Sequence, residues 1–282
     1  GIGDNIDITV TWSAAITKTG SPTLSLSNGA TASYQSGDGT TALVFRYTVQ
    51  QGDTASNNLT VNSYSGTLED AGNNAAPQCS GSLGSVKVDA QRPTLSGVGI
   101  ASNNSTTTLA KVGDEVTLTF TADETIQTPV VTFQSGGVAI TNSPAYNNTS
   151  GNTWTAKYTV HSSDTNGNVT YSIAFSDSAG NAGTAVTSGT GSVNIDTVSP
   201  TAAITYSTAG PFKQGDTSTI TATFTEDIVN TPKIAISGVS SITATNLTAD
   251  PGGDKKKWTY AYTAPAGDGT ETIALSVGID AA

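Results

Sequence analysis

The feature that most constrains this chain is an internal repeat. A Pro-Thr pair begins at Pro93 and again at Pro200, and a strand-like segment ending in an acid precedes each pair, at Asp89 and Asp196. The two prolines are 107 residues apart, and so are the two aspartates. A sequence that repeats at a fixed period is built from copies of one structural unit. The chain is therefore predicted to be a tandem array rather than one large domain.

Further motifs follow in a constant order. A Gly-Asp pair opens a run of alternating β-branched residues, a Pro opens the next predicted strand, and Trp-x-x-x-Tyr and Asp-x-Ala-Gly-Asn come later. The Gly-Asp pairs begin at Gly3, Gly113 and Gly215, and the strand-opening prolines are Pro22, Pro129 and Pro232. The aromatic pairs are Trp154 with Tyr158 and Trp258 with Tyr262, and the Asp turns begin at Asp70, which Ala-Gly-Asn follows directly, and at Asp177, which Ala-Gly-Asn follows after one residue.

These motifs divide the chain into three units, residues 1–91, 92–198 and 199–282. Each has the size of a small β-sandwich. The first unit lacks the Pro-Thr strand that precedes Gly-Asp elsewhere, and the third stops before a Ser-Val-x-Ile-Asp strand, so only the second is predicted to be complete. A missing strand leaves an unpaired sheet edge. Either the sequence is an excerpt of a longer array, or neighbouring subunits complete one another by strand exchange.

Within each unit the apolar residues alternate with Thr. Val116, Leu118 and Phe120 are separated by threonines, and Ile220, Ala222 and Phe224 repeat the pattern. Period-two alternation indicates a strand with one buried and one solvated face. The four-residue step of Trp-x-x-x-Tyr places both rings on one face. We interpret these rings as core, the alternative being an exposed platform for stacking sugars.

Composition excludes several classes of protein. The chain has 22 acidic and 11 basic residues, a net charge of −11, whereas nucleic-acid binding needs a basic surface. It has no apolar run long enough for a membrane span. With one His (His161, predicted on the surface) and one Cys (Cys79, predicted in a loop) it has few groups for nucleophilic catalysis and cannot form an internal disulfide. We predict that it is not an enzyme.

The ordered set of motifs resembles the bacterial Ig-like domains that occur in tandem in large surface and adhesin-type proteins. The resemblance covers essentially residues 1–282 and is clearest in 92–198. It implies an all-β fold of three Ig-like Greek-key sandwiches in an elongated array, located outside the cell. The first copy departs from the pattern, with Trp12 in place of the Phe and Ala15 near the position of Glu124 and Glu226.

Acidic residues recur at the predicted junctions and turns. Loops at one end of a sandwich come together, and carboxylates from different loops could bind Ca²⁺, which takes six to eight oxygen ligands. The alternative is that each Asp caps its own turn. The candidate calcium ligands are Asp70, Asp89, Asp114, Asp177, Asp196 and Asp216.

Three functions are compatible with these features. The first is a non-catalytic spacer in an adhesin-like surface protein, contacting neighbouring Ig-like domains, with any cell-surface or glycan ligand bound outside this segment. The second is a self-assembling subunit of a surface layer or extracellular filament. The third is an accessory part of a secreted modular enzyme. Calcium is the only cofactor that the sequence predicts.

Overall fold

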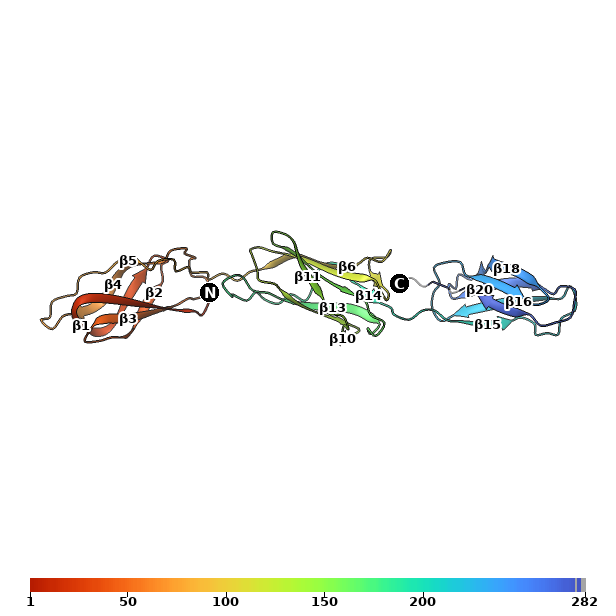
Figure 1. Ribbon diagram of the computed structural model, residues 1–282, viewed down its shortest axis with the longest axis horizontal. Helices are drawn as coiled ribbons and strands as arrows, with labels where there is room; N and C mark the ends of the chain where they lie inside the picture. Colours follow the sequence, from red (N-terminus) through yellow and green to blue (C-terminus); the bar gives the residue numbers. More distant parts are fainter. Residues whose placement is uncertain (277, 280–282) are drawn as a thin grey trace.

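The protein is three β-sandwiches in a row (Figure 1). The computed structural model describes residues 1–276 and 278–279, and the regular structure of these residues consists of strands alone. Each sandwich has its own hydrophobic core, whose buried residues fall within 8–90, 100–195 and 220–264. The prediction of an all-β array of three Ig-like sandwiches is confirmed, while the unit boundaries at 91/92 and 198/199 stay predictions. The described residues form no helix that could cross a membrane.

The first sandwich is organised around one long strand. Its first half pairs with β3 and its second half with β4, and the five strands join in the order β2-β3-β1-β4-β5. No described strand pairs with the other edge of residues 5–11. The strands are β1 (Asn5–Leu26), β2 (Thr31–Ser36), β3 (Thr40–Thr48), β4 (Thr60–Glu69) and β5 (Gly81–Ser82).

The prediction that Pro22 opens a new strand is wrong, because Pro22 lies inside β1. The pairing of β1 with β4 shifts between Thr19 and Thr23, which is where a β-bulge accommodates a residue without an N–H. The facing residue is Gly66, with φ of 98°, and a Cβ on it would lie 2.9 Å from the Pro22 Cα. Glycine therefore lets the two strands approach closely at the bulge.

The second sandwich is closed by a C-terminal segment. Its two sheets have the orders β10-β9-β13-β14-β7 and β11-β12-β8-β6. In the segment 186–196, β14 pairs antiparallel with β13 and parallel with β7, and the side chains of Val193 and Ile195 are fully buried. The strands are β6 (Leu95–Ser102), β7 (Leu109–Ala110), β8 (Glu115–Ala122), β9 (Val130–Ser135), β10 (Val138–Ala139), β11 (Ala145–Ser150), β12 (Thr153–Thr159), β13 (Gly167–Ala174) and β14 (Asn194–Ile195).

The third sandwich repeats this plan up to its last described strand. Its sheets have the orders β15-β16-β20-β19 and β18-β17-β21, so β21 lies at a sheet edge. The strands are β15 (Ala202–Tyr206), β16 (Thr217–Phe224), β17 (Lys233–Ser237), β18 (Ser241–Asn246), β19 (Thr248–Ala249), β20 (Lys257–Thr263) and β21 (Thr272–Leu275).

The alternating residues form the cores, as their pattern predicts. Val116, Leu118 and Phe120 on β8 are fully buried, and the threonines between them face outward. Trp154 and Tyr158 are buried in the same core, so the interpretation of this aromatic pair as core is confirmed. Burying such side chains contributes about 1.5–3 kcal/mol each.

Candidate metal centre at the first domain junction

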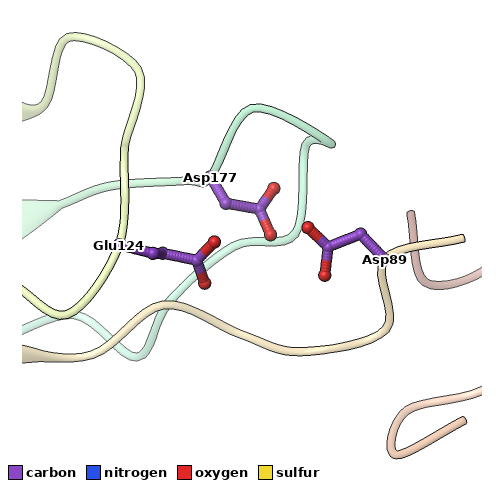
Figure 2. A group of neighbouring side chains, drawn as sticks. All are labelled: Asp89, Glu124 and Asp177. Carbon is purple, nitrogen blue, oxygen red and sulfur yellow. The ribbon is translucent and has the colours of Figure 1, made fainter. Parts of the chain in front are cut away.

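Three carboxylates converge where the first sandwich meets the second (Figure 2). Asp89 ends the last segment of the first sandwich, Glu124 lies in the turn after β8, and Asp177 begins the loop after β13. Sandwich loops at one end lie close together, so residues far apart in sequence meet here. One oxygen from each side chain lies within 4.8 Å of the other two.

The three side chains differ in burial and in hydrogen bonding. Asp177 is fully buried, and both of its oxygens accept hydrogen bonds from Asn181, from the backbone N–H at 2.8 Å and from Nδ2 at 2.7 Å. Asp89 is half-buried and accepts a weaker bond from the Gln91 N–H at 3.2 Å. Glu124 is half-buried, and within the described residues no hydrogen bond to its carboxylate is found.

The cluster consists of three acidic side chains. Among the described residues, no Lys, Arg or terminal ammonium forms an ion pair with any of the three carboxylates. Burial raises the pKa of Glu124, and the charges of Asp89, Asp177 and Asp123 raise it further. Buried like charges are costly unless they are neutralised by protons or by a bound cation.

Asn181 links the two sandwiches at the same place. Besides holding Asp177, its Nδ2 donates to the backbone oxygen of Asp89 at 3.2 Å, and its Oδ1 accepts a hydrogen bond from the N–H of Ile2. Arg92 adds a second connection, donating through Nη1 to the Ala182 oxygen at 2.6 Å and through Nε to Gln51 at 3.4 Å. The buried Asn181 amide therefore joins its own loop, the connecting segment and the first strand region of the preceding sandwich.

The other candidate ligands lie elsewhere, in turns of their own. Asp70 accepts hydrogen bonds from Gly72 and Asn74, and these bonds, Asn74 first, lower its pKa. Asp114 accepts from Lys111 and Asn104, and Asp216 from the Lys213 N–H. These contacts are the turn-capping arrangement that the alternative interpretation describes.

Asp196 stands at the second junction, at the position that Asp89 has at the first. Its Oδ1 accepts hydrogen bonds from Asn166 at 2.7 Å and from the Val198 N–H at 3.0 Å. The sequence equivalents of Glu124 and Asp177 at this junction are Glu226 and Asp280. Asp280 lies outside the described residues, so the second junction is not compared further.

Asp89 and Asp177 were candidates from the sequence, whereas Glu124 and Asn181 were not. Both had a signal in the repeat: Glu124 recurs as Glu226, and Asn181 ends the Ala-Gly-Asn motif. Three carboxylates that form no ion pair within the described part of the chain suit Ca²⁺, a hard cation with oxygen ligands and flexible geometry. The residues present fit such an ion, and calcium at this position stays a prediction.

Comparisons with known proteins add the following. No protein-family model matches the sequence, and no curated protein is significantly similar to it. Among solved structures, titin domains I67–I69 are 12% identical with a TM-score of 0.43, covering 93% of this chain and 83% of that one. The mouse nectin-like molecule 4 ectodomain (Ig1–Ig3) is 13% identical with a TM-score of 0.32, covering 99% and 95%. At such low identities and TM-scores these likenesses carry no argument about function.

Proposed function

We propose that this chain is a non-catalytic extender segment of an adhesin-like protein on the cell surface or secreted from the cell. The observation that carries the proposal is the end-to-end arrangement of three sandwiches, each with a core of its own (Figure 1). An array whose units contact only their neighbours gains length with each repeat. The low share of charged residues, 12%, and the outward threonines of the strands support a role in holding other parts of a protein apart.

The first joint supports this function through its hydrogen bonds. Interfaces between domains of one chain are commonly small and permit relative motion. Here Asn181 and Arg92 connect the second sandwich to the first through three hydrogen bonds that involve Ile2, Asp89 and Gln51, and Arg92 is held in turn by the Ala182 oxygen. A joint held at several points resists bending better than a bare linker.

We further propose that Ca²⁺ binds between Asp89, Glu124 and Asp177 and stiffens this joint. Asp89 belongs to the connecting segment, and the other two residues belong to the second sandwich. An ion that bridges them would oppose separation of the two parts and would neutralise the repulsion among the carboxylates. Since Asn181 already orients Asp177, part of the ligand set is held in place before the ion binds.

The extender function is tested by attaching a different globular marker protein to each end of the chain and imaging single molecules by electron microscopy. A narrow distribution of marker separations, at the distance set by a straight row, is expected. Markers that come together, or separations spread evenly from short to long, would show that the chain does not act as a spacer. The same chain with six glycines inserted after Arg92 is the matched control for a flexible joint.

A second candidate function is self-assembly by strand exchange. It is favoured by the first half of β1, whose outer edge has no partner among the described strands. In the second sandwich the same edge of β8 is paired with β6. Sedimentation of the purified chain over a wide concentration range tests it. Polymers that grow with concentration would favour this function, and a monomer throughout would exclude it.

A further inference from the structure

The chain leaves the second sandwich through a short connecting segment that begins after β14 (Figure 1). The side chain of Asn166, in the bend before β13, holds the start of this segment. Its Nδ2 donates to Asp196 Oδ1 at 2.7 Å. Its Oδ1 accepts hydrogen bonds from the Thr197 N–H at 2.8 Å and from the Thr197 hydroxyl at 2.7 Å. One amide therefore clamps two consecutive residues of the segment.

The clamp shortens the part of the segment that is free to bend. The Asp196 Oδ1 that Asn166 holds also accepts a hydrogen bond from the Val198 N–H at 3.0 Å. On the other side, the N–H of Thr201 donates to the Thr225 hydroxyl of the third sandwich at 3.1 Å. A Ser-Pro pair is all that lies between Val198 and Thr201 in the sequence, and proline has a fixed φ. The Asn166 side chain therefore leaves the second joint with little freedom.

The sandwich fold itself does not require an Asn at this position. In the second sandwich the next residue, Gly167, pairs with Ile195. In the first sandwich the equivalent pair, again directly before the junction aspartate, is Ser56 with Val88. The residue before Ser56 is Ala55, whose side chain cannot form a hydrogen bond. The amide clamp is therefore a feature of the second joint and not of the plan that the sandwiches share.

The residue after Asn166 has to be glycine for a steric reason. Gly167 has a φ of 138°, a conformation that favours glycine, and a Cβ on it would lie 2.9 Å from the Gly136 Cα. The clamp thus needs Asn at one position, and the close approach of the backbone at Gly136 needs Gly at the next. The second joint contains an Asn-Gly pair because two separate requirements meet there.

An Asn-Gly pair is prone to deamidation, since glycine has no Cβ to hinder attack by its own main-chain nitrogen on the preceding side chain. The Gly167 nitrogen gives its proton to a base and bonds to the Asn166 Cγ, the bond from Cγ to Nδ2 breaks, and ammonia leaves. Water then opens the cyclic imide at either carbonyl, which gives aspartate or isoaspartate. The net reaction consumes water and converts a neutral amide into a carboxylate.

Asn166 is accessible to this reaction, whereas the other Asn-Gly pair of the chain is protected. Asn166 is exposed, so water and base reach it. Gly167 is the first residue of β13 and Ile195 the last of β14, so their pairing lies at the end of a ladder, where local opening is easiest. In the other pair, Asn28 is 9% exposed and its Nδ2 donates to the Tyr47 hydroxyl at 3.0 Å.

We propose that Asn166 clamps the second joint and that its deamidation through Gly167 releases the clamp, so that the joint becomes more flexible as the protein ages. The new carboxylate faces the Asp196 carboxylate at the place where the amide now donates at 2.7 Å. A hydrogen bond is thereby replaced by repulsion between like charges. Isoaspartate also lengthens the main chain before β13. The reaction does not depend on the extender function, although its effect on the length of the row does.

Peptide mapping by mass spectrometry tests the chemistry. The full chain is kept in chelator in mildly alkaline buffer, and each Asn is followed with time. We expect Asn166 to deamidate at least about tenfold faster than Asn28, because opening at a ladder end needs less free energy than opening of a core. In Asn166→Gln, whose longer side chain cyclises far more slowly, the product at this position should disappear while the rate at Asn28 is unchanged. Equal rates at the two pairs, or an Asn166 that stays intact, would overturn the proposal.

The clamp is tested by the distance distribution between spin labels on the second and third sandwiches, measured in chelator. Asn166→Asp reproduces one product of the reaction and should broaden the distribution, and Asn166→Ala, which removes the clamp without adding charge, should broaden it less. Asn168→Asp is the matched control, because it adds the same charge at an exposed position on the same strand and should have no effect. The labels span the second joint alone, so a flexible first joint leaves this result unchanged.

Three results would overturn the clamp. The first is a distribution as narrow in Asn166→Asp as in the parent, and the second is equal broadening by Asn168→Asp. The third is loss of the second sandwich's unfolding transition in calorimetry of Asn166→Ala, which would make Asn166 a residue that the fold needs rather than a clamp on the joint.

Discussion

Replacing Glu124 by Gln is expected to stabilise the second sandwich in chelator and to reduce the stabilisation that calcium gives it. In chelator, Glu124 shares a space with Asp89 and Asp177, and the nearest oxygens lie within 4.8 Å. Two unit charges at that distance repel by roughly 1 kcal/mol at the permittivity of water and roughly 3 kcal/mol at an effective permittivity near 20. Removing the charge while keeping the shape should therefore raise the free energy of unfolding by about 1–3 kcal/mol at neutral pH.

The pH dependence has a definite sign. The pKa of Glu124 is raised in the folded protein, by burial first and by neighbouring carboxylates second. A raised pKa means that the folded state holds its proton more tightly than the unfolded state, so stability falls as pH rises above the unfolded value. In chelator, the advantage of Glu124→Gln over the parent should therefore be absent in acid and should grow toward neutral pH.

Calcium should reduce the advantage of the variant over the parent. At an ion concentration of 100 times the dissociation constant, binding stabilises the parent by about 2.7 kcal/mol, and the variant, with one carboxylate fewer, should gain less. The assay is thermal unfolding in chelator and in millimolar calcium. Glu115→Gln is the matched control, because it removes a charge in the same sandwich from a carboxylate paired with Lys157, and it should keep the calcium shift of the parent. Equal calcium shifts in parent and Glu124→Gln would refute the site, and no gain in chelator would refute the repulsion.

Three further outcomes are expected. Asn181→Ala should loosen the first joint, broadening the distance distribution between spin labels on the first and second sandwiches. Asn74→Ala, which alters the exposed Asn four residues after Asp70 in the first sandwich, should leave it unchanged. Leu118→Ala should cost about 2–5 kcal/mol, visible in calorimetry as a shift confined to the unfolding of the second sandwich; shifts in all three sandwiches would contradict independent cores. Burial raises the pKa of Tyr47 from 10.0 to about 12 in the folded protein. The protonated hydroxyl therefore stabilises the fold fully below pH 10.0, and this stabilisation is lost as pH rises to about 12. Tyr47→Phe should reduce the alkaline slope in urea titrations, because the pKa values of Tyr64, Tyr158, Tyr171 and Tyr262 are raised too and keep part of it; an unchanged slope would show that Tyr47 does not contribute.

The fold was predictable because its signals are local and repeated. The alternation of Val116, Leu118 and Phe120 with threonine determines which face of the strand is buried, and no later contact changes that result. The position of Pro22 within β1 was not predictable. It depends on Gly66, which faces it from a strand far along the chain and allows the bulge.

The candidate site was predictable only in part, for the same reason. Asp89 and Asp177 stand at repeated positions before a junction and a turn, and the prediction that loops at one end converge applies to both. Asp70 also accepts hydrogen bonds from an Asn four residues on, yet it is half-buried rather than fully buried and belongs to no cluster of three carboxylates found among the described residues. Whether a repeated Asp meets other carboxylates depends on which sandwich end lies next to it, and a motif does not contain that information.

The central claim is that the three sandwiches form a stiff row whose first joint is held by an ion. Small-angle X-ray scattering of the full chain in millimolar calcium and in chelator tests it most directly. We expect one elongated particle in calcium, with a maximum dimension that matches the straight row of Figure 1, and a shorter mean dimension with a broader distribution in chelator. A compact particle in either condition, or identical profiles in both, would contradict the claim.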